Sequence, residues 1–316
     1  MLIFSIVLTG IKFFAYFITR SNAVLSDASE SIINVIAGAF ALFSIHYAAR
    51  PKDENHPYGH GKIEYLSAGF EGSLILMTGL AIIGKAIYNF FHPQTIDSLE
   101  IGVYLTVFSG GCNYFMGIYL VRKGKEYHSV LMNADGKHLL ADTYSSLALV
   151  IGLIIIHFTG YLWFDNVLAI FLGIFIISTG YTITKQSITG LLDEADDATI
   201  DQVIAILNAN RQSKWIDMHN LRVLKYGSFL HVDCHITLPW FLSLEDAHTE
   251  VTAVENLLNN NMEGRAEFFI HADPCLPISC PICIISDCKF RQYDFVKQLV
   301  WEHANLLPDK KHEINS

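Results

Sequence analysis

The chain has 316 residues, of which 52% are hydrophobic and only 16% are charged, and its formal net charge is −10. Soluble domains carry about 25% charged residues, so the composition excludes an ordinary soluble protein over the whole length. The acidic balance also excludes the basic surface that binds nucleic acid. Up to about Ser187 the chain is a series of apolar runs, and acids, amides and histidines become common after it. This shift predicts a membrane domain followed by a soluble one.

Six runs are apolar over the roughly 20 residues that a membrane helix needs. They lie at about 2–19, 22–48, 63–91, 99–121, 129–158 and 163–185. Lys and Arg gather in two of the connecting loops and after the last run, whereas the alternate loops hold only Arg20. The positive-inside rule therefore places both termini in the cytoplasm. The first run has no basic segment before it and no small-residue cleavage site after it, so we expect a true span and not a signal peptide.

The remainder of the chain is expected to form a small α+β domain in the order α-β-β-α-β. Apolar residues at helical spacing predict helices at 198–209 and 247–258, and alternation predicts strands at 215–225, 229–238 and 266–272. A short amphipathic helix is expected at about 293–306. The predicted domains are 1–187 in the membrane, 188–275 as the α+β domain, and 276–316 as a cysteine-containing tail with that short helix.

Two polar pairs interrupt the apolar runs. Glu30 and Asn34 are four residues apart in the second run, and His138 and Asp142 have the same spacing in the fifth. In helices each pair shares one face, and polar groups at membrane depth are costly enough to suggest function. Together the four could bind one divalent cation, and mixed nitrogen and oxygen ligands suit zinc, iron, cobalt or manganese better than calcium. The alternative to metal binding is that these four side chains only form hydrogen bonds between helices. Asp27, one turn before Glu30, lies on an exit path, takes up a proton, or is a solvated acid at the membrane interface.

Proton coupling follows from the same ligands. His138 can titrate near neutral pH, and a ligand must lose its proton before it binds a metal. Metal and protons therefore compete for one site, which is what an antiporter requires.

Further histidines and acids lie outside the apolar runs. Asp53, His56 and His60 follow the second run in the segment PKDENHPYGHGK, which is either a metal site or a polar turn. Strand 229–238 alternates so that its polar residues share one face, which is either a metal site or a solvated sheet face. The polar candidates in this domain are His219, His231, Asp233, His235, His248, His271 and Asp273.

Four cysteines cluster near the C-terminus in the pattern C-x4-C-x2-C-x4-C. They are Cys275, Cys280, Cys283 and Cys288. A cytoplasmic location disfavours disulfides. A structural zinc, free or redox-active thiols, and an iron–sulfur cluster all remain open for this possible tail site.

The chain resembles the cation diffusion facilitator family over nearly its whole length. The residues that carry the resemblance are SNAVLSDASESIIN, HPYGHGKIEYL, ADGKHLLAD, LLDEAD and IHADPC. The resemblance implies a Y-shaped homodimer of six-helix units with metallochaperone-like cytoplasmic domains for regulation and dimerisation. It also implies export of a divalent metal, usually zinc, in exchange for protons, with no organic cofactor.

The resemblance assigns residues to three metal sites and one ion pair. It places Glu30, Asn34, His138 and Asp142 in the transport site, and Asp53, His56 and His60 in a loop site. The cytoplasmic site would comprise His219, His235, His248, His271 and Asp273, and Lys62 and Asp193 would pair near the dimer interface. Family members usually have aspartates, or histidine with aspartate, where this chain has Glu30 and Asn34. The metal is therefore open among zinc, iron(II), manganese, cobalt and cadmium.

The leading hypothesis is thus a proton-coupled metal exporter, expected in a bacterial inner membrane. The alternative is a membrane-anchored metal sensor or storage protein that uses the soluble histidines and cysteines. An intramembrane metalloprotease would need a motif such as HExxH, which the chain lacks, so an enzyme is not expected.

Overall fold

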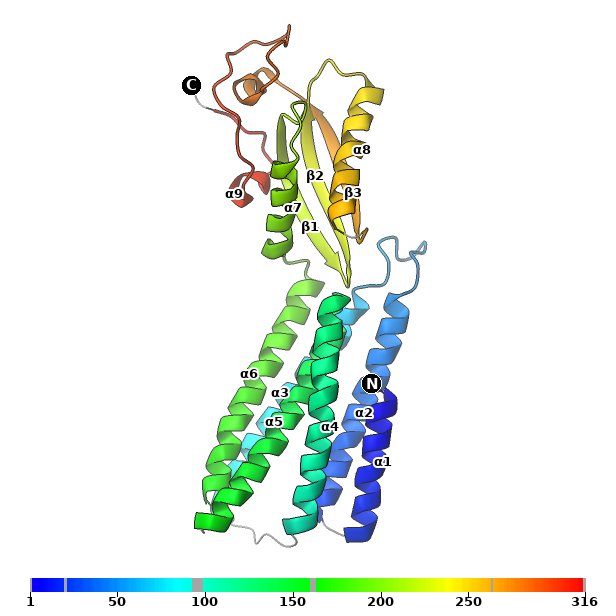
Figure 1. Cartoon of the computed structure of the whole chain (residues 1–316), viewed down its shortest axis with the longest axis vertical. Coiled ribbons are helices and arrows are strands. Elements are labelled where there is room, and N and C mark those ends of the chain that lie inside the picture. The colour runs from blue at the N-terminus through cyan, green and yellow to red at the C-terminus, as the bar shows by residue number, and fades with distance from the viewer. Residues whose placement is uncertain (1, 20–21, 93–98, 160–162, 263, 315–316) are drawn as a thin grey trace. The chain divides into compact units, whose positions relative to one another are not determined.

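The computed structural model describes residues 2–19, 22–92, 99–159, 163–262 and 264–314 (Figure 1). The chain divides into two compact units, Met1–Leu192 and Asp193–Ser316. Each unit has its own hydrophobic core.

The described part of the first unit consists of six long helices. They are α1 (Leu2–Thr19), α2 (Asn22–Ala48), α3 (Ile63–Phe91), α4 (Leu99–Glu126), α5 (Val130–Thr159) and α6 (Trp163–Leu191). Each coincides with one of the expected apolar runs, although α4 and α6 continue for about one further turn. Within the described residues, Ile63–Phe91 and Asn166–Leu191 are long and apolar enough to cross a membrane, with mean hydropathies of 1.7 and 2.0. That all six helices are spans remains a prediction.

Helix α3 packs along α6, and glycines bring the two backbones close together. A Cβ atom on Gly79 would lie 3.0 Å from the carbonyl oxygen of Gly173, and one on Gly180 would lie 2.9 Å from that of Gly72. Small residues at such positions allow helices to approach closely where no hydrophobic effect drives them together. The pair α3–α6 is therefore joined by a glycine seam formed by Gly72, Gly79, Gly173 and Gly180.

The second unit contains a three-stranded mixed sheet with two helices. Its elements are α7 (Asp197–Ala209), β1 (Asp217–Tyr226), β2 (Phe229–Leu238), α8 (Leu244–Asn261) and β3 (Ala266–Pro274), in the α-β-β-α-β order that was expected. Strands β1 and β2 are antiparallel, whereas β3 runs parallel to β2 after the α8 crossover. Side-chain N-caps define where α7 and α8 begin. The Asp196 side chain accepts a hydrogen bond from the Thr199 N–H, and the Ser243 hydroxyl accepts one from the Asp246 N–H.

The chain after β3 is mostly irregular, with a 3-10 helix η1 (Pro277–Ile282) and one helical turn α9 (His303–Leu306). The predicted helix at 293–306 is therefore wrong except for its last residues. The side chain of Asn208 donates to the Trp301 carbonyl at 2.7 Å and accepts from the Trp301 N–H at 3.2 Å. The N–H and C=O groups of Trp301 therefore bond to Asn208 and not to neighbouring turns of a helix. The side chains of Trp301 and Leu306 are buried in the core.

Candidate metal sites

Three of the four residues expected in the transport site lie together between α2 and α5. Asn34 Nδ2 donates to Asp142 Oδ2 at 3.1 Å, and His138 Nε2 lies 3.1 Å from Asn34 Oδ1. His138 Nε2 and Asp142 Oδ2 are 3.8 Å apart, one helical turn separating their residues. The side chains of Glu30 and Asp27 lie outside the described residues. We call the three residues the Asn34 cluster.

The Asn34 cluster offers one nitrogen, one amide oxygen and one carboxylate to a cation. Only 7% of the His138 surface is exposed, and its Nδ1 is buried without a hydrogen-bond partner among the described residues. The Asn34 amide donates to Asp142 and its oxygen lies against His138, so these contacts link α2 to α5.

Other buried carboxylates in the first unit were missed by sequence reasoning. Glu64 of α3 accepts a 2.6 Å hydrogen bond from the Ser129 hydroxyl. Glu71, 1% exposed, lies beside Asp135, 5% exposed. The rule that an acid in a long apolar run is a functional suspect would have found Glu64 and Glu71. The i,i+4 spacing did not identify them because they are seven residues apart on α3.

The loop between α2 and α3 brings Asp53, His56 and His60 together. Asp53 Oδ1 lies 3.0 Å from His56 Nδ1, and Asp53 Oδ2 lies 3.3 Å from His60 Nε2. Burial alone would raise the pKa of Asp53, but hydrogen bonds from the His56 backbone and ring lower it below its usual value. The side chain of His60 is almost fully buried, so one ligand is held rigidly while the other two face solvent. All three ligand atoms lie within 4.8 Å of one another, a spacing that one cation can bridge.

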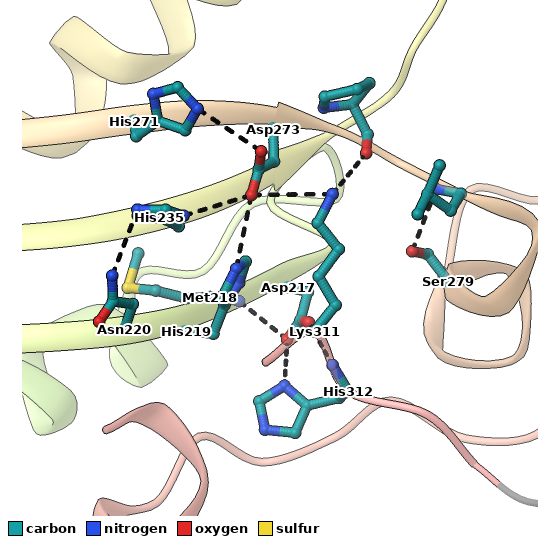
Figure 2. A network of polar contacts seen from close by, with 12 residues as sticks. Asp217, Met218, His219, Asn220, His235, His271, Asp273, Ser279, Lys311 and His312 are labelled. Atoms are coloured by element: carbon teal, nitrogen blue, oxygen red, sulfur yellow. Dashed lines mark hydrogen bonds and ion pairs between the residues drawn. The ribbon is translucent and has the colours of Figure 1, made fainter. Parts of the chain in front are cut away.

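The sheet of the second unit builds the other cluster, drawn in Figure 2. His235 in β2 pairs with His219 in β1 on one side and with His271 in β3 on the other. Asp273 Oδ2 lies 3.4 Å from His219 Nε2 and 3.5 Å from His235 Nδ1, and Oδ1 lies 3.6 Å from His271 Nε2. Strand pairing therefore places three imidazoles around one carboxylate. We call His219, His235, His271 and Asp273 the sheet cluster.

The surroundings of the sheet cluster favour the metal-binding form of histidine. Burial lowers the pKa of His219, and the neighbouring His235 and Lys311 lower it further, whereas Asp217 and Asp273 oppose the shift. A neutral imidazole is the form that binds a metal. Lys311 also extends its ammonium group to 3.7 Å from Asp273 Oδ2 and donates to the Pro274 carbonyl at 3.0 Å (Figure 2). The Lys311 ammonium group thus offsets part of the negative charge of the Asp273 carboxylate.

Some predicted site residues are not brought together by the structure. His248 is exposed on α8 and is not in the sheet cluster. His231 pairs with Glu267 at 3.2 Å, near the opposite end of β2 from the sheet cluster. Lys62 and Asp193 belong to different units, so their pairing stays a prediction.

Family comparisons bear directly on both units. The family model described as the cation efflux transmembrane domain matches residues 1–192. The model described as the cytoplasmic domain of cation efflux proteins matches residues 195–275. The chain belongs to the cation diffusion facilitator family.

Relatives of this cation efflux protein occur in distant organisms. It is 29% identical to an uncharacterized transporter of Synechocystis sp., covering 84% of this chain and 85% of the relative. It is 25% identical to the cation-efflux pump FieF of Shewanella oneidensis, covering 85% and 90% of the two chains. Metal tolerance protein C1 of Arabidopsis thaliana is 31% identical over 84% of this chain and 59% of its own length. The protein is therefore an integral membrane transporter of metal cations, and not an enzyme.

Proposed function

We propose that this cation efflux protein is an antiporter that exports a divalent transition metal, with zinc the leading candidate, in exchange for protons. The Asn34 cluster carries the proposal, because it places a histidine, an amide and a carboxylate from two helices around one point within a membrane domain. Glu30, one turn from Asn34 on α2, would supply the second carboxylate. Two carboxylates would neutralise a divalent ion, and the imidazole favours zinc, cobalt or iron over calcium.

Proton coupling would follow from competition at the same atoms. A metal displaces protons from His138 and from any protonated acid, and reprotonation of these groups on the far side would release the metal. The loop residues Asp53, His56 and His60 would bind metal at the cytoplasmic end of α2.

The second unit would regulate export. The sheet cluster would bind cytoplasmic metal and tighten a homodimer, in which His248 would reach the site and Lys62 would pair with Asp193. All six helices would cross the bilayer of a bacterial inner membrane with both termini in the cytoplasm, as the Lys and Arg distribution favours.

Uptake into reconstituted vesicles tests the proposal. Zinc, manganese, iron(II), cobalt and cadmium would each be offered with and without a pH gradient. Asp142→Asn keeps the shape of the side chain and should abolish gradient-driven flux, whereas Asp201→Asn, the same change on the exposed face of α7, should leave it intact. If Asp142→Asn transports like the wild type, the Asn34 cluster is not the transport site. If the wild type itself moves none of the five metals while the second unit still binds metal, the protein is a membrane-anchored sensor or store and the transport proposal fails.

A further inference from the structure

The tail after β3 is ordered without regular secondary structure to support it. Residues 275–302 contain only η1, yet Ser279 is 2% exposed, Ile282 1% and Cys283 7%. Ile282 and Cys283 form a small core with Ile216 at the start of the sheet. Irregular segments longer than about 12–15 residues are uncommon in compact domains unless they are functional. Something other than backbone pairing must therefore hold this segment.

The four tail cysteines surround one cavity of about 60 Å³. Backbone hydrogen bonds hold two of these cysteines in place. The Cys275 N–H donates to the Leu238 carbonyl at 2.8 Å, which continues the sheet, and the Cys283 N–H donates to the Cys280 carbonyl at 3.2 Å. All four are free thiols with no disulfide between them. The pattern C-x4-C-x2-C-x4-C thus folds so that all four cysteines line one cavity.

Backbone donors point at these sulfurs. The Trp240 N–H lies 3.4 Å from Cys275 Sγ, and the Gln292 N–H lies 3.4 Å from Cys280 Sγ. A neutral thiol is a weak acceptor, so donors directed at two of the four sulfurs are suited to thiolates, the form that binds metals.

Arg291 fixes the loop and supplies charge. Its guanidinium donates to the carbonyls of Cys280 at 2.9 Å, of Cys283 at 2.8 Å and of Ile285 at 2.8 Å. Four thiolates around a divalent ion leave two negative charges, and a cation held beside them offsets part of that excess.

We propose that Cys275, Cys280, Cys283 and Cys288 bind a metal centre of four thiolates, a zinc ion or an iron–sulfur cluster, which holds the tail against the sheet. Three of these four cysteines lie beyond residue 275, where the matched cytoplasmic-domain model ends. Among the described residues, no three of these sulfurs lie within 4.8 Å of one another. A tetrahedral zinc with Zn–S of about 2.3 Å would draw them to about 3.8 Å, while a cluster of several iron atoms keeps its thiolates further apart.

The test uses the full chain in detergent, purified under reducing, oxygen-free conditions. Cobalt(II) added to the metal-free protein should produce a thiolate-to-cobalt charge-transfer band, which histidine and carboxylate sites cannot give. The double variant Cys280→Ser/Cys283→Ser should lose the band, and Cys112→Ser, which alters a cysteine in α4, should keep it. Visible absorption with acid-labile sulfide in the protein as isolated would identify an iron–sulfur cluster, and zinc alone would identify a zinc site.

The rate at which the cysteines of the wild-type protein react with a thiol reagent provides a second measurement, which does not depend on the folding of a variant. The four tail cysteines should react with a thiol reagent at least tenfold more slowly in the metal-loaded protein than after chelation. Equal rates, together with no charge-transfer band, would overturn the proposal. Because these readouts do not involve metal flux, they remain informative even if the transport proposal fails.

Discussion

The side chain of Asn34 lies between His138 and Asp142 and donates to the Asp142 carboxylate at 3.1 Å. An amide at this position binds the acid of the opposite helix without adding charge. The amide hydrogen bond therefore links α2 to α5, and Asp142 supplies the carboxylate among the described residues of the cluster.

Asn34→Asp should strengthen zinc binding at the Asn34 cluster by about tenfold, because a second charge near the ion outweighs the lost hydrogen bond. Metal uptake into vesicles over a range of concentrations measures the effect, with Asn113→Asp in α4 as a control for adding an acid to the membrane domain. Unchanged selectivity and affinity across the five metals would show that Asn34 does not contact the ion.

Lys311→Met should raise metal affinity at the sheet cluster by about tenfold, because its ammonium competes for Asp273. Zinc-competition titrations of the full chain measure this, with Asp273→Asn as the reference for a lost site. Lys310→Met is a matched control, because the Lys310 side chain is 73% exposed and pairs with Glu313 at 3.7 Å. Equal gains in the two lysine variants would indicate a general charge effect and not competition at the site.

Gly79→Ala should destabilise the first unit by about 1–3 kcal/mol, since the added Cβ would lie 2.7 Å from Ile177 Cγ1 and 3.0 Å from the Gly173 carbonyl. Gly84→Ala, on the same helix, meets nothing within 4 Å and should be neutral or stabilising by up to about 1 kcal/mol. Thermal unfolding in detergent compares the two. Equal melting temperatures would mean that α3 and α6 are not in backbone contact.

His312→Gln should weaken the attachment of the chain end in a pH-dependent way. His312 Nδ1 lies 2.5 Å from Asp217 Oδ1, and this hydrogen bond raises the pKa of the half-buried imidazole. A raised folded-state pKa stabilises the fold below the unfolded value of about 6.5, and that contribution disappears as pH rises through the folded-state pKa. We expect a loss of about 1 kcal/mol at pH about 5.5, allowing for solvent screening. Hydrogen exchange of the Asn305–Ile314 backbone at several pH values would detect it, and a pH-independent effect would contradict the ion pair.

Much of the fold was predictable because its signals are local. Helix α2 follows from a run of apolar residues closed by Pro51, and the i,i+4 spacing alone places His138 beside Asp142. Sheet alternation likewise indicated the strands to within a few residues. These features depend on side chains near in sequence, which a pattern can reveal.

The remaining features depend on contacts between distant residues. His219 meets His235 only because β1 shifts register between His219 and Arg222. Lys311 reaches Asp273 from 38 positions along the chain, a separation that no pattern encodes. The predicted helix at 293–306 failed for the same reason: its amphipathic pattern was real, but Asn208 takes the backbone groups of Trp301.

The glycine seam between α3 and α6 has a mechanical consequence for transport. Helices α3 and α6 approach closely at Gly72–Gly180 and Gly79–Gly173, so they cannot slide past each other without a clash and should move as one rigid pair. Helices α2 and α5, which carry the Asn34 cluster, pack against each other only lightly. Movement within this unit should therefore occur more easily between α2 and α5 than between α3 and α6, and substitutions in the glycine seam should act mainly on stability.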